Sequence, residues 1–217
     1  MKDAQGDLAP GRTRWRRFAA VVLPAAAAAG AIVFGMSNGA IAASFAVSGQ
    51  TFKVSADRLV GTGFVQYGGA VHPKDEATGK AKDVPVATSG IADARLYNLC
   101  QSVKVPGMPV SLVINAGGDP DAPAHATNLL IDMADLQGDA TFTNIHIGQD
   151  AGTLDAAGPD VKGQSGSFAQ QASDVEIKNL KQVAWSTSAG TFALNGLHLY
   201  VDVNPQGPKE CFPDPKK

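Results

Sequence analysis

The chain has 217 residues, of which 44% are hydrophobic and 18% charged, with 18 basic and 20 acidic side chains. Because no basic excess is present, a nucleic-acid-binding function has little support. The 24 Gly and 13 Pro, together with many Val, Thr and Ala, favour strands and turns over helices.

The first 43 residues are organised like an export signal. Four arginines between positions 12 and 17 precede an uncharged apolar run from Phe18, and Ala40-Ile41-Ala42 supplies a small-x-small cleavage site. The run is also long enough for a retained membrane anchor, which needs about 20 apolar residues. We assign residues 1–43 to a signal peptide or membrane anchor and favour cleavage after Ala42 or Ala43. The remainder is then secreted or held at the extracellular face of the membrane.

Residues 44–217 have the length of a single domain with its own core. The first 42 residues hold five of the 18 basic and two of the 20 acidic residues, so the rest has 13 basic and 18 acidic residues and a net charge of −5. We predict one β-rich extracellular domain over residues 44–217.

Apolar residues beyond the export segment mostly repeat with period two, which is typical of strands. We expect strands at 45–47, 52–54, 59–67, 91–103 and 110–114, one hairpin around 137–139 (strands 128–136 and 140–147), and another around 186–190 (strands 174–185 and 191–203). Residues 68–89 and 148–166 are rich in Gly, Pro and polar residues and are predicted to be long exposed loops. The fold class is therefore all-β, either sandwich-like or an elongated twisted antiparallel sheet.

A weak internal similarity links several of the predicted strands. Residues 94–101 (ARLYNLCQ) resemble residues 175–182 (VEIKNLKQ), and both contain Asn-Leu near their end. This pattern is typical either of a degenerate stacked repeat or of unrelated strands that share the same alternation.

The chain contains two cysteines, Cys100 and Cys211. In an oxidising compartment an even pair usually forms a disulfide, and we predict one between them. A reactive or metal-binding pair is the alternative, although neither a CxxC spacing nor an adjacent His supports it.

No catalytic or metal-binding motif is recognisable. The nearest approach to Gly-x-Ser-x-Gly is Gly163-Gln164-Ser165-Gly166-Ser167, which lies in a predicted loop, and Ser188 also lacks the flanking glycines. His146 and His198 occupy matching positions in two similar strands and would share a metal or a proton if they lay on one face; surface strand residues are the alternative. We predict no catalytic residue, no metal and no cofactor, and lean away from an enzyme.

The alternating strands also suggest a face for an apolar ligand. A concave sheet face rich in small residues would accommodate an acyl chain or sterol, and the alternative is an ordinary packed core. The residues predicted to line such a face are Phe142, Val175, Ile177, Trp185, Phe192 and Leu194.

Three segments resemble an actinobacterial family of exported proteins of unknown function, whose members are often labelled "cholesterol esterase". They are the arginine-led export segment, residues 44–56 (SFAVSGQTFKVSA) and residues 94–102 (ARLYNLCQS). The label implies a lipid or sterol ester hydrolase. The shared motifs are structural and carry no catalytic residue over to this chain.

The leading functional hypothesis is a non-enzymatic exported or cell-envelope protein that binds a lipid-like apolar ligand or a surface partner. The alternatives are the ester hydrolase that the family label implies, and a structural envelope protein that self-associates through exposed strand edges.

Overall fold

The computed structural model describes residues 49–74 and 79–214, all of which belong to one compact unit, Ala46–Lys217. The predicted export segment, residues 1–43, and the predicted strand at 45–47 lie outside the described residues. Among the residues described, no helix has the length and hydropathy that crossing a bilayer requires.

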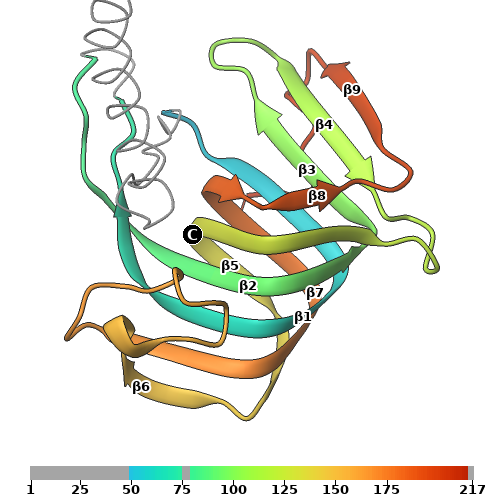
Figure 1. The fold of residues 1–217 in the computed structure, drawn as a ribbon. Helices are drawn as coiled ribbons and strands as arrows, with labels where there is room; N and C mark the ends of the chain where they lie inside the picture. The colour runs from blue at the N-terminus through green and yellow to red at the C-terminus, as the bar shows by residue number, and fades with distance from the viewer. Residues whose placement is uncertain (1–48, 75–78, 215–217) are drawn as a thin grey trace, which may run out of the picture. The chain divides into compact units, whose positions relative to one another are not determined.

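The described residues form one antiparallel sheet of nine strands, which confirms the predicted all-β class (Figure 1). The sequence left a sandwich and a single twisted antiparallel sheet as alternatives, and the structure has the single sheet. A 3₁₀ turn, η1 (Ala151–Thr153), follows the sixth strand. The strands are β1 (Phe52–Val71), β2 (Val84–Tyr97), β3 (Leu99–Lys104), β4 (Val110–Ala116), β5 (Ala124–Thr143), β6 (His146–Asp150), β7 (Phe168–Ser188), β8 (Thr191–Ala193) and β9 (His198–Val203).

Four long strands of this sheet close on themselves. β1 pairs with β2, β2 with β5 and β5 with β7. β7 then returns to β1 through a ladder that runs from Phe52↔Ala184 to Tyr67↔Ala169. We call this closed set of β1, β2, β5 and β7 the cylinder. β6 and β8 extend its wall by pairing with β7 and β5.

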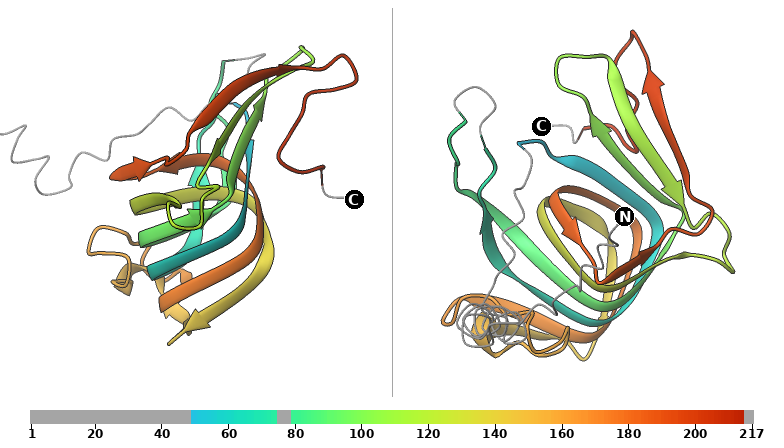
Figure 2. Two further views of the ribbon diagram at one scale, coloured as in Figure 1. Left: turned by 90° about the vertical axis from the view of Figure 1, so that its right-hand side faces the viewer. Right: turned by 45° about the horizontal axis from the view of Figure 1, so that its top comes forward.

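The remaining strands, β3, β4 and β9, form an extension that we call the wing. β3 pairs with residues 53–55 of β1, β4 pairs with β3, and β9 pairs with β4. The wing projects away from the curved strands of the cylinder (Figures 1 and 2). β9 and β6 are the two ends of the strand order.

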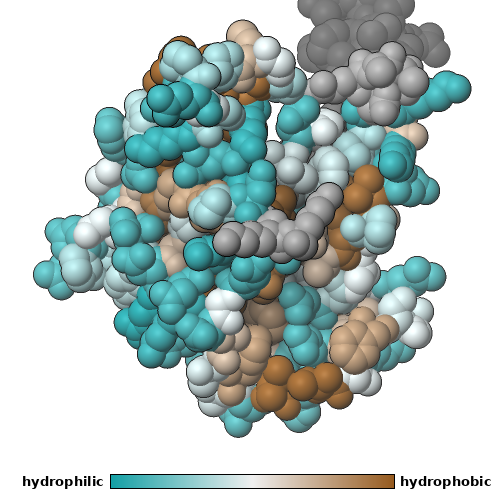
Figure 3. Space-filling model, turned by 180° about the vertical axis from the view of Figure 1, so that it is seen from behind, coloured by the Kyte–Doolittle hydropathy of each residue, from teal (hydrophilic) through white to brown (hydrophobic). Residues whose placement is uncertain are grey.

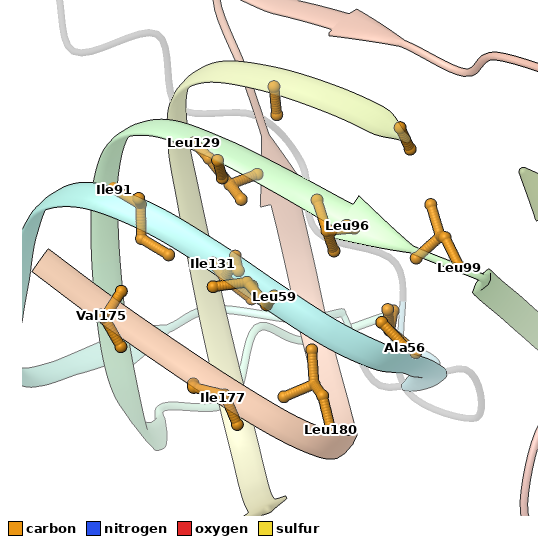
Figure 4. Close-up of a cluster of buried hydrophobic side chains, with 14 of the residues drawn as sticks. Ala56, Leu59, Ile91, Leu96, Leu99, Leu129, Ile131, Val175, Ile177 and Leu180 are labelled. Atoms are coloured by element: carbon orange, nitrogen blue, oxygen red, sulfur yellow. The ribbon is translucent and has the colours of Figure 1, made fainter. Parts of the chain in front are cut away.

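Aliphatic side chains from all four strands fill the cylinder (Figure 4). Leu59, Val175 and Leu180 are each at most 2% exposed. A fully buried side chain of this kind contributes about 1.5–3 kcal/mol. Small residues let the walls approach, since a Cβ on Gly61 would lie 2.6 Å from Cγ2 of Ile91. The inward positions are therefore a packed core and leave little internal space.

At several points a residue with a left-handed backbone conformation interrupts the alternation of inward and outward side chains along a strand. Asn98, Asn128 and Asn179 have φ of 53°, 48° and 54°. Because one such residue shifts the pleat by one position, inward residues there are spaced by three, as from Ile177 to Leu180. Each of the three asparagines directly precedes a leucine that is 3% exposed or less: Leu99, Leu129 and Leu180.

Asparagine suits these positions because its short polar side chain tolerates the left-handed region and hydrogen-bonds locally. Nδ2 of Asn179 donates to Oδ2 of Asp139 across the sheet (2.8 Å), and Nδ2 of Asn98 donates to Oδ2 of Asp57 (3.0 Å). The Asn-Leu similarity in the sequence therefore marks these resets of the pleat.

Both predicted hairpins are wrong. Residues 128–147 contain one continuous strand, β5, which passes through Gln137–Asp139 with a register shift and turns only after Thr143. β7 and β8 both pair with β5 and not with each other, and β9 pairs with β4. The predicted strand 91–103 is divided at Asn98 into β2 and β3.

The two predicted loops are also more ordered than expected. Much of 68–89 belongs to β1 and β2, which pair as far as Val71↔Val84. Within 148–166, Leu154 is fully buried and packs with Val65 and Ala169 on the outer face of the cylinder. Asp150 anchors this segment by accepting from the backbone N–H groups of Gly152 and Gly166, which lowers the pKa of its carboxyl.

We expect Asn179→Val to lower the free energy of unfolding by about 1–2 kcal/mol more than Asn179→Gly, because a β-branched residue is strained at positive φ. Both variants lose the hydrogen bond to Asp139, so the difference between their unfolding free energies reports the backbone strain at residue 179. Urea denaturation measures it, and equal stability of the two variants would contradict this account.

Candidate functional site

Five of the six residues predicted to line an apolar ligand face lie together in or against the packed core of the cylinder. Val175 and Ile177 are 1% and 5% exposed and belong to the packed core. Phe142, Phe192 and Leu194 are partly buried and pack against that core. Trp185 is partly buried and lies at a register shift between β5 and β7, where it has no paired residue on β5.

The cylinder also lacks room for a lipid. A cleft lined by Leu96, Leu129 and Phe192, among others, holds about 20 Å³ of free space. That volume accommodates a water molecule, whereas pockets for drug-sized ligands measure about 300–1,000 Å³. An acyl chain placed in this cleft would have to displace core side chains.

The histidines do not converge on a reaction centre. His146 lies on β6 and His198 on β9, at opposite ends of the strand order, so the structure does not bring them together. His125 pairs with Asp93 (2.6 Å) and His72 with Asp83 (2.8 Å). Within residues 49–74 and 79–214, no histidine is hydrogen-bonded to a hydroxyl, and no three His, Cys, Asp or Glu residues are grouped to hold a metal.

The wing carries the largest set of exposed apolar side chains in the described residues. Leu199, Val201 and Val203 of β9 are 53%, 59% and 67% exposed. They lie directly opposite half-buried aliphatic residues of β4, so all six side chains share one face. We call this set the apolar platform: Val110, Leu112, Ile114, Leu199, Val201 and Val203.

The opposite face of the wing is covered by residues 205–214, which we call the strap. Figure 2 (left) shows the C-terminal segment on one side of the wing. Cys100 and Cys211 form the predicted disulfide, which ties the strap to β3. Beneath the strap, Ser102, Ser111 and Val113 are at most 2% exposed, and the backbone N–H of Cys211 donates to Oγ of Ser102 (3.0 Å).

A group of charges fastens the strap further. Nζ of the buried Lys53 donates to Glu210 (2.7 Å) and to the carbonyl of Phe212 (2.9 Å), and pairs with Asp214 (2.6 Å). Lys104 also contacts Glu210 (2.7 Å). Lys53 and then Lys104 hold the pKa of Asp214 below its ordinary value. The hydrogen bond to Glu210 raises the pKa of Lys104.

The strap leaves the platform as the uncovered face of the wing. The side of the domain seen in Figure 3 is mostly hydrophilic, and hydrophobic residues show there only in small separate areas. The sequence contained the relevant signal, since Leu197, Leu199, Val201 and Val203 alternate with polar residues. Alternation alone does not say which face is buried, and sequence reasoning missed the platform for that reason.

The model of a family of unknown function (DUF6230) matches residues 48–212. No curated protein and no solved structure matches the chain. The matched range includes the cylinder, the wing, both cysteines and most of the strap.

Removing the disulfide should loosen the strap. For the 111-residue separation of Cys100 and Cys211, chain entropy gives an upper bound of about 4–5 kcal/mol. We expect Cys100→Ser/Cys211→Ser to lower the free energy of unfolding by a large part of that amount. Hydrogen exchange should show faster exchange at the Cys211 amide. Unchanged stability and unchanged exchange would contradict the proposed fastening.

The strap should also loosen in acid. Because the pKa of Asp214 is lowered in the folded state, its contribution is complete above its unfolded value, 3.8, and is lost as pH falls through the folded pKa. We expect this part of the acid destabilisation to be absent from Asp214→Asn. Unfolding free energies measured from pH 6 downward test the prediction, and parallel profiles for the two proteins would refute it.

Proposed function

We propose a function from the chain's own surface, because the chain belongs to DUF6230, a family of unknown function. We infer that it is an exported, non-enzymatic protein of the cell envelope. Its apolar platform binds a lipid-like partner surface.

The exposure of the platform carries this proposal. Soluble proteins rarely expose contiguous aliphatic side chains, and such patches mark docking sites for proteins or membranes. Half or more of the surface of Leu199, Val201 and Val203 is in contact with solvent. The platform is a sheet face and not a concave pocket, which favours contact with an extended apolar surface over the enclosure of one small molecule.

The strap supports the same interpretation. The disulfide and the Lys53 contacts fix the reverse face of the wing before any partner arrives. A preorganised surface loses little conformational freedom on binding, so more of the apolar contact energy is retained as affinity.

Two features support a location outside the cytoplasm. Disulfides persist in oxidising compartments, and Cys100–Cys211 is one. The arginine-led segment before Phe18 has the organisation of an export signal. We therefore propose that the protein is secreted or held at the extracellular face of the membrane.

A lipid or sterol ester hydrolase is the alternative that the resembled actinobacterial family's label implies. Such an enzyme needs a nucleophile, a base and oxyanion donors within mutual reach. In the described part of the chain, no hydroxyl is hydrogen-bonded to a histidine, so no observation favours the hydrolase.

We expect the purified protein to co-sediment with vesicles of uncharged phosphatidylcholine. Leu199→Ser/Val201→Ser should weaken this binding about 30-fold, because two partly exposed aliphatic side chains lose about 1 kcal/mol each. Added salt should have little effect, since the platform carries no charge.

The matched control is Ile147→Ser/Phe168→Ser, which removes two side chains that are equally exposed (67% and 64%) at the β6 end of the sheet. This control should bind vesicles like the unmodified protein. Absence of vesicle binding by the unmodified protein, or equal loss in both double variants, would overturn the proposal.

A further inference from the structure

The outer edge of β9 has unpaired backbone groups. The N–H of Asn204 donates to the carbonyl of Pro109 (3.0 Å), which fixes the hydrogen-bonding phase of the β4–β9 ladder. By alternation, His198, Tyr200 and Asp202 direct their backbone groups toward β4. Leu199, Val201 and Val203 therefore direct theirs away from it, and no other strand of the described residues pairs with that edge.

β9 also lacks three of the features that protect edge strands, namely lysine, proline and a bulge. Lysine, proline and bulges commonly block pairing at such edges. At the opposite end of the sheet, β6 is short and has a register shift at Gly148, whose φ is +86°. Residues 198–203 (HLYVDV) contain no Lys, Pro or Gly, and β9 pairs with β4 without a register shift.

The sequence of β9 is self-complementary when two copies run antiparallel about Tyr200. Leu199 then lies opposite Val201 of the second copy, and these two residues exchange both of their edge hydrogen bonds. Leu199 and Val201 direct their backbone groups away from β4, so this pairing uses the groups that the β4–β9 ladder leaves free. Two such pairs, related by a twofold axis, give four hydrogen bonds.

On the strap side, the same register places His198 opposite Asp202 of the second copy. Oδ2 of Asp202 is buried and has no hydrogen-bond partner among the described residues. That oxygen is shielded within the single chain, so it is the complementary chemistry of an imidazole directly opposite a carboxylate that favours this register. This complementarity of His198 and Asp202 is independent of the free backbone edge and favours the same partner.

We propose that a second copy of this chain pairs with the first through β9, antiparallel and centred on Tyr200. The two wings become one continuous sheet, β3–β4–β9–β9–β4–β3. Both apolar platforms lie on the same side of it and both straps on the other. The inference uses the edge of β9, whereas the proposed function uses its apolar face, so each can fail without the other.

Sedimentation analysis of the purified protein without lipid, over micromolar to millimolar concentrations, tests the pairing. We expect a monomer–dimer equilibrium that is weakened about 10-fold or more by His198→Asp, because like charges then face each other in both symmetric pairs. His198→Asp/Asp202→His exchanges the two partners and should restore dimerisation. The control His146→Asp, on the exposed strand β6, should leave it unchanged.

A second variant tests whether the backbone hydrogen bonds at the free edge of β9 are needed for dimerisation. Val201→Pro removes an N–H that points to the free edge, so it should abolish dimerisation while the β4 ladder and the disulfide persist. Circular dichroism and thiol titration verify that the variant is folded. A monomer at every concentration, a dimer that resists both His198→Asp and Val201→Pro, or failure of the exchanged variant to recover would each overturn the proposal.

Discussion

The pairing of β1 with β7 is the constraint on which the rest of the structure depends. It joins residues more than a hundred positions apart, from Phe52↔Ala184 to Tyr67↔Ala169, and turns an open sheet into the cylinder. Once closed, the inward faces of four strands are sealed and filled by residues such as Leu59 and Leu180. The interior is thereby filled by packed side chains that stabilise the fold. β1 contributes to both parts of the domain, because residues 53–55 pair with β3 of the wing on one side and β7 on the other.

Local pattern was sufficient to predict the fold class but not the order of the strands. Period-two alternation correctly indicated strands near 52–67 and 110–114, and the cysteine count indicated the disulfide. The hairpin expected at Gln137–Asp139 failed because Gly138 lies within one long strand, opposite the extra residue of a bulge in β7, and a glycine at such an irregularity has the same sequence signature as a turn. The β1–β7 ladder has no local signature, since it depends on partners distant in sequence.

The candidate site was misplaced for a related reason. Val175, Ile177 and Phe142 have the same aliphatic and aromatic alternation as Leu199, Val201 and Val203. Only the topology distinguishes them, because β7 is enclosed by two neighbours and β9 has one. A prediction of exposed apolar surface therefore requires the strand order, and the strap adds a further condition by covering one side of the wing. The sequence shows four histidines as candidates for catalysis or metal binding. It does not show that His146 and His198 lie on strands at opposite ends of the sheet.

The position of the strap in the chain has a consequence for how the protein matures. Cys211 follows every strand of the cylinder and wing in chain order, whereas Cys100 lies on β3. The crosslink can therefore form only after residue 211, beyond the last strand, has been synthesised. While the chain is still being synthesised, the disulfide therefore cannot guide the pairing of its strands. The β1–β7 ladder has a similar requirement, because β1 must wait for the synthesis of β7, and contacts between residues so distant in sequence are slow to form.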